Sequence, residues 1–104
     1  MEYKILYHEG EQIGISTVIK TGILTEEKKS FIIKNKKGDK IDINTINSVK
    51  KVAINGIGNL LKVDFLGKIV YLAAYKGICI ANFFATIDED ATNKIHERIV
   101  LRKK

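Results

Sequence analysis

The first 75 residues consist of short runs of β-branched and other apolar residues, separated by turn residues such as those of KKGD at 36–39. The runs recur at intervals of roughly 8–12 residues, which is typical of an antiparallel barrel or sandwich. Apolar and polar residues alternate within them, as in LKVDF at 61–65, so that each strand has one face for a core. We predict strands near 3–7, 12–20, 22–26, 30–35, 39–44, 48–55, 59–66 and 68–75.

The stretch NGIGN at 55–59 allows two interpretations, a phosphate-binding loop or the bend of a hairpin. A phosphate-binding loop delivers the chain into a helix, whose N-terminus holds the anion. The residues that follow, LLKVDFLG at 60–67, are strand-like and too short for a crossover helix. Asn-Gly is also the strongest two-residue hairpin signal. The sequence therefore favours a hairpin here.

After Tyr75 the period changes to that of a helix. Ile87, Ala91, Ile95 and Ile99 recur every four residues, acidic residues occupy 88–90, and basic residues occupy 102–104. We predict one amphipathic helix at about 87–101, with Thr86 and Glu89 as its capping box. The segment 77–85 is left open as either a last strand or an extension of this helix.

A chain of 104 residues, with 45% hydrophobic and 29% charged residues, predicts one globular domain spanning 1–104. The single cysteine, Cys79, cannot form an internal disulfide, which fits a reducing compartment. The N-terminal residues lack the pattern of a secretory signal, and no apolar run approaches the ~20 residues of a membrane-spanning helix. We therefore expect a cytoplasmic protein.

The net charge of +6 is concentrated in one segment. Residues 28–51 hold eight lysines and only two acidic residues. Such a segment could attract anionic lipid headgroups, nucleic acid or an acidic partner. A solvated sheet face, with lysine favoured by composition alone, remains an equal interpretation.

No arrangement typical of catalysis is visible. The serines lack a nucleophile elbow, Cys79 lies among apolar neighbours, and the carboxylate pairs fall in turns or at the helix start. His8, His96 and Cys79 are too scattered to predict a metal site. We expect no enzyme activity, no metal and no cofactor.

Order and motifs together resemble the bacterial pleckstrin-homology (PH) and GRAM-like domains. HEGEQI at 8–13 resembles their opening element, TGILTEEKKSFII at 21–33 their first strand-turn-strand, and IDINTINSV at 41–49 a later step into a hairpin. The resemblance implies a mainly β (α+β) fold, a partly open antiparallel barrel of about seven strands capped by one C-terminal amphipathic helix.

The resemblance also implies a binding module, which most simply binds a protein partner or itself. The alternative is a peripheral binder of anionic lipid or another polyanion through a lysine patch. By likeness to PH domains that bind phosphoinositides, the candidate anion-binding residues are Lys20, Lys28 and Lys29, joined by Lys36 and Lys37 if their turn lies at the same rim. A small nucleic-acid-binding barrel ranks third, because Phe31 is the one aromatic residue of the lysine-rich segment. No small-molecule substrate is evident.

Overall fold

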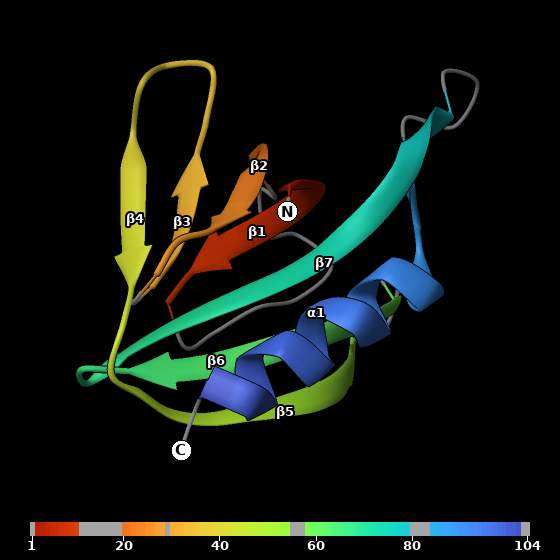
Figure 1. Cartoon of the computed structure of the whole chain (residues 1–104). Helices are drawn as coiled ribbons and strands as arrows, with labels where there is room; N and C mark the ends of the chain where they lie inside the picture. Colours follow the sequence, from red (N-terminus) through yellow and green to blue (C-terminus); the bar gives the residue numbers. More distant parts are fainter. Residues whose placement is uncertain (1, 11–19, 29, 55–57, 80–83, 103–104) are drawn as a thin grey trace.

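The backbone is an antiparallel meander of strands followed by one helix (Figure 1). The computed structural model describes residues 2–10, 20–28, 30–54, 58–79 and 84–102. Its elements are β1 (Glu2–Glu9), β2 (Lys20–Glu26), β3 (Phe31–Lys34), β4 (Lys40–Ile43), β5 (Ile46–Ile54), β6 (Gly58–Phe65), β7 (Lys68–Cys79), β8 (Phe84–Ile87) and α1 (Glu89–Arg102).

The strands form one continuous path in the order β4-β3-β2-β1-β7-β6-β5, and β8 pairs with β7. Consecutive strands pair with each other except β4 and β5, and β1 pairs with β7 as well as with β2, which joins the first half of the sheet to the second. Within the described residues, β4 and β5 form the two ends of the path and do not pair with each other. The predicted fold class, a mainly β partly open barrel with one C-terminal helix, is confirmed.

Most predicted strands agree with the observed ones to within a few residues. The predicted strand at 12–20 lies outside the described residues except for Lys20, which begins β2. The segment 77–85 begins as the end of β7 and ends within β8, while its residues 80–83 lie outside the described part.

The glycine-rich stretch joins two paired strands, as the hairpin interpretation requires. β5 and β6 are antiparallel with Ile54 opposite Gly58, and β6 continues as a strand to Phe65. Residues 55–57 themselves lie outside the described part of the chain. A helix does not follow the stretch, so it lacks the helix N-terminus that a phosphate-binding loop needs.

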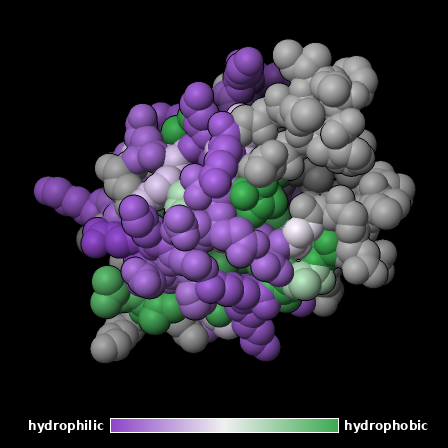
Figure 2. Space-filling model, turned by 90° about the vertical axis from the view of Figure 1, so that its right-hand side faces the viewer, coloured by the Kyte–Doolittle hydropathy of each residue, from purple (hydrophilic) through white to green (hydrophobic). Residues whose placement is uncertain are grey.

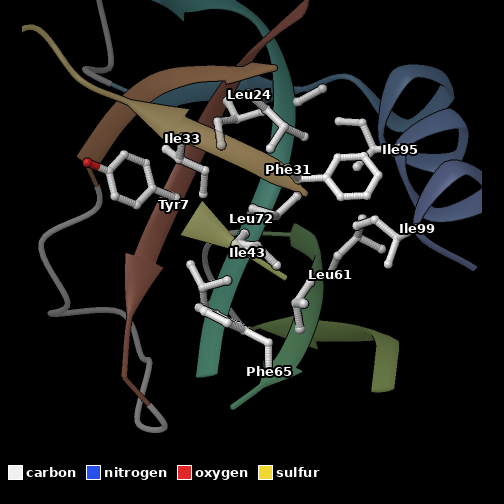
Figure 3. Close-up of a cluster of buried hydrophobic side chains, with 14 residues drawn as sticks. Tyr7, Leu24, Phe31, Ile33, Ile43, Leu61, Phe65, Leu72, Ile95 and Ile99 are labelled. Carbon is white, nitrogen blue, oxygen red and sulfur yellow. The ribbon is translucent and has the colours of Figure 1, made fainter. Parts of the chain in front are cut away.

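The core fills the space between the two halves of the sheet and the helix (Figure 3). Phe31 of β3 lies against Ile95 and Ile99 of α1, and all three side chains are almost fully buried. Further buried members come from β1, β2, β4, β6 and β7, and they include Ile5, Leu24, Ile43, Leu61, Val63 and Leu72. Alternation along the strands therefore gives each half of the sheet a face in this core, and a second, smaller cluster of Leu60, Tyr71 and Ala73 lies on β6 and β7.

The helix begins at Glu89, two residues later than predicted, and its N-cap is Asp88 instead of Thr86. Asp88 Oδ1 accepts a hydrogen bond of 3.1 Å from the Ala91 N–H, which is one of the donors left unpaired at a helix start. The backbone of Ala74 in β7 explains the shift. Its carbonyl accepts from the Asp88 N–H at 2.8 Å, and this bond fixes where the chain leaves the sheet.

A buried threonine completes the same junction. Thr92 Oγ1 accepts from the Ala74 N–H at 3.0 Å and donates to the Asp88 carbonyl at 2.8 Å. Thr92 is only 4% exposed, so these bonds replace contacts with water that burial removes. Both backbone groups of Ala74 thus bind the first turn of the helix, and this docks α1 on β7.

Candidate anion-binding surface

The five candidate lysines divide between the two ends of the first half of the sheet. Lys20 begins β2, and Lys36 and Lys37 form the turn between β3 and β4. The start of β2 lies beside the end of β3, because Ile23 pairs with Lys34. Lys20, Lys36 and Lys37 therefore lie at the same end of this half of the sheet. Lys28, in the turn between β2 and β3, lies at the other end, about 20 Å away along β2. Lys29 lies outside the described residues.

The predicted rim is therefore split. Lys36 and Lys37 share an end with Lys20 and not with Lys28, so Lys20 and Lys28 cannot hold one small anion together. The split follows from the antiparallel pairing of β2 with β3, which places the start of one strand beside the end of the next.

Asn35 fixes the turn that carries Lys36 and Lys37. Its Oδ1 accepts hydrogen bonds from the backbone N–H groups of Lys37 and Asp39, at 2.9 and 3.0 Å. Its Nδ2 donates to the hydroxyl oxygen of Tyr7 at 3.0 Å, and Tyr7 is only 2% exposed. An asparagine side chain that bonds to its own turn in this way is a common turn device. The two exposed lysines are thus held on a turn anchored to the core.

The register places further lysines in a row across the outer face. Lys4 of β1 lies opposite Ile23 of β2, Ile23 opposite Lys34 of β3, and Lys34 opposite Lys40 of β4. Their neighbours Ile5, Leu24, Ile33 and Ile41 belong to the core, so the row itself faces outward. Sequence reasoning did not select Lys4, Lys34 or Lys40 as site residues. Alternation indicated which face each would occupy, but the alignment of the three depends on the register.

Lys4, Ile23 and Lys34 of this row line a groove of about 530 Å³ on this face. Its lining carries three positive side chains, Lys4, Lys34 and Lys36, and one carboxylate, Glu2. The remaining lining residues are Thr21, Gly22, Ile23, Thr25, Asn35 and Tyr75. The groove combines positive charge, two threonine hydroxyl groups and the side chains of Ile23 and Tyr75, which suits a ligand that is anionic and partly apolar.

Gly22 lies beneath this groove and must be a glycine. A Cβ added there would lie 2.7 Å from the Lys34 carbonyl oxygen and 3.0 Å from Tyr7 Cε1. Atoms do not approach so closely without a shift of the backbone. The absence of a side chain therefore allows β2, β3 and the Tyr7 ring to pack closely under the lysines.

The pairing of Lys34 with Lys40 is unfavourable for stability. Like charges directly opposite each other on neighbouring antiparallel strands repel, at a cost that falls in the range of about 0.2–1 kcal/mol for cross-strand pairs. An anion bound beside the two ammonium groups would offset this repulsion. Lys50 and Lys62 form a second such pair, in the other half of the sheet.

A second cavity, of about 620 Å³, lies where β4 faces the β6–β7 turn. Lys40 and Lys68 contribute positive charge, Glu9 and Asp42 contribute negative charge, and Phe65, Ile41 and Val70 add apolar surface. Because the charges balance, this cavity shows no preference for an anion or a cation. It is therefore a weaker candidate than the groove.

The other residues considered for chemistry lie apart in the fold. His8 is near the end of β1, His96 is on α1, and Cys79 is the last residue of β7. Among the described residues, no three metal-binding side chains of the His, Cys, Asp and Glu types form a group. Within the described part of the chain, the helix α1 is not long and apolar enough to cross a membrane.

Neither the scan against protein-family models nor the search of curated proteins found a match for this chain.

Proposed function

We propose that this chain is a non-enzymatic binding module of the PH/GRAM-like type, working in the cytoplasm, which binds a polyanion through the outer face of β1–β4. The observation that carries the proposal is the row of Lys4, Lys34 and Lys40 on one face, of which Lys4 and Lys34 line the groove. β1, β3 and β4 contribute one lysine each to the same register position. A solvated face would need no such alignment.

The fold supports the family part of the proposal. The chain combines a seven-strand antiparallel path, open between β4 and β5, with one helix that packs into the core at the C-terminus. These are the features that the sequence resemblance implied. Two of the motifs add to it, since the motif at 21–33 covers the paired strands β2 and β3, and the motif at 41–49 covers the step from β4 to β5.

Electrostatics sets the expected strength of binding. A lysine near an anionic surface contributes about 1 kcal/mol, and salt reduces this contribution because the charges are exposed. Lysine presents a compact charge and not the planar fork of arginine, so it favours charge density over one fixed ligand shape. We expect binding that is strong at low ionic strength and weak at high ionic strength.

The test is a binding panel with the full chain at low and high salt. The probes are vesicles of equimolar phosphatidylserine and phosphatidylcholine, short single-stranded oligonucleotides, and inorganic polyphosphate. At least one should bind at low salt and be released at high salt. Lys4→Glu combined with Lys34→Glu should abolish binding, whereas Lys94→Glu, an exposed lysine of α1, should leave it nearly unchanged. If no probe binds the native chain at low salt, the proposal fails.

A protein partner, or a second copy of the chain, is the second candidate. It is favoured by the two sheet ends, β4 and β5, which have a neighbour on one side in the described structure. Among the described residues, the large exposed hydrophobic ones are Ile23 on β2, Leu66 in the turn between β6 and β7, and Val100 and Leu101 on α1. Figure 2 shows one face on which hydrophilic side chains dominate and hydrophobic ones form small separate groups. Light scattering coupled to size exclusion tests this candidate, since an oligomer that persists at high salt would favour it.

A further inference from the structure

We infer that the groove over β1–β3 is a binding site for single-stranded nucleic acid, with Tyr75 as the residue on which a base stacks. This inference rests on the proposed polyanion binding and names its ligand class. It depends on one residue that the electrostatic argument does not use.

Tyr75 is the aromatic residue of the groove. It lies on β7 next to Ala74, which is opposite Ile5 of β1, so Tyr75 borders Lys4 on the outer face. Its side chain is half-buried, which leaves part of it exposed toward the groove. The row therefore begins with an aromatic side chain and continues through Lys4, Ile23 and Lys34.

Single-strand binders combine a positive groove that follows the phosphates with side chains on which bases stack. Here the lysines supply the charge, and the hydroxyl groups of Thr21 and Thr25 supply further donors for phosphate oxygens. Tyr75 supplies a stacking surface, and Ile23, which is 37% exposed, supplies an apolar contact beside it. All four kinds of contact lie on one face.

A bilayer fits this geometry less well. Lys4 and Lys34 line the groove beside Ile23 and Tyr75, and a flat bilayer would use the charges of these lysines alone. A bilayer or an acidic peptide would also need no aromatic side chain at the end of the row. The contribution of Tyr75 therefore separates nucleic acid from these other anions.

The experiment measures fluorescence anisotropy of a labelled oligothymidylate of about 12 nucleotides, within the ~4–16 nucleotides of known small single-strand sites. Tyr75→Ala should raise the dissociation constant about tenfold, because one stacked base is lost. Tyr75→Phe keeps the ring and should bind as the native chain does. Tyr75→Leu keeps apolar bulk without the ring, and it replaces Tyr75→Ala in the test if the alanine variant does not fold.

The salt dependence of oligonucleotide binding distinguishes the lysines, which contact phosphates, from Tyr75, which stacks on a base. Lys4→Gln and Lys34→Gln should each reduce the slope of log affinity against log salt by about 0.7, the value for one phosphate contact on a single strand. Tyr75→Ala should lower the affinity and leave this slope unchanged. Lys94→Gln on α1 is the matched control and should alter neither quantity.

Two results would overturn the inference and leave the polyanion proposal standing. One is native affinity in both Tyr75→Ala and Tyr75→Leu. The other is binding to phosphatidylserine vesicles or polyphosphate without binding to the oligonucleotide. If no polyanion binds, the inference and the proposed function fail together.

Discussion

The two halves of the sheet share one core but differ in what lies against them. The second half, β5–β7, is covered by α1, which packs on all three strands (Figure 1). The first half, β1–β4, carries the groove, and its side chains reach α1 through the packing of Phe31 and through the ion pair of Glu26 with Arg98. Each half also contains a directly opposed lysine pair, Lys34–Lys40 in the first and Lys50–Lys62 in the second. The difference suggests a division in which the helix-covered half supplies stability and the other half supplies a binding surface.

The largest expected effect comes from removing helix side chains from the shared core. Ile95 is fully buried against Phe31, so Ile95→Ala should lower the free energy of unfolding by about 2–5 kcal/mol, through lost burial and the cavity left behind. Ile95→Val is the matched control and should cost about 0.5–1.5 kcal/mol. Urea unfolding measures both. A small loss for Ile95→Ala would show that α1 does not stabilise the sheet.

The next effect concerns the junction of α1 with β7. Thr92→Val keeps the shape of the side chain but leaves the Ala74 N–H buried without its acceptor. We expect a loss of about 1–3 kcal/mol in urea unfolding. Thr92→Ser retains the hydroxyl and should lose less. Equal losses in the two variants would indicate that the methyl group, and not the hydrogen bond, stabilises the junction.

A smaller effect is expected from the link between the first half and the helix. Arg98 Nε and Nη2 donate to the two carboxylate oxygens of Glu26, each at 3.0 Å. The Glu26 side chain is 7% exposed, but that of Arg98 is 51% exposed, so water screens the pair. A double-mutant cycle with Glu26→Gln and Arg98→Met should give a coupling of about 0.5–1 kcal/mol that declines with added salt. A coupling of zero would mean that this ion pair does not stabilise the contact between the first half and the helix.

The smallest expected change in stability tests the comparison most directly. Lys40→Glu and Lys50→Glu each convert a repulsive lysine pair into an attractive one, and each should stabilise the chain by a few tenths of a kcal/mol. Thermal unfolding measures this gain. Polyanion binding should fall in Lys40→Glu and persist in Lys50→Glu. Equal losses of binding would show that the two halves do not differ in function.

Local patterns in the sequence predicted the elements of the fold. Alternation in LKVDF placed Leu61, Val63 and Phe65 in the core, and the four-residue spacing placed Ile95 and Ile99 there as well. These patterns succeed because the period of a strand or a helix is a property of neighbouring residues. The helix start was wrong by two residues because the backbone of Ala74, distant in sequence, binds the Asp88 N–H.

The sequence by itself determined which residues face the core, which end of the chain is helical, and that residues 28–51 are rich in lysine. Only the tertiary structure decided which lysines lie next to one another on the sheet. It separated Lys28 from Lys20 and aligned Lys4, Lys34 and Lys40, one of which lies outside the lysine-rich segment. The physical reason is that strand register depends on pairing between residues far apart in the chain, and a pattern of period two does not specify which residue of one strand faces which residue of the next.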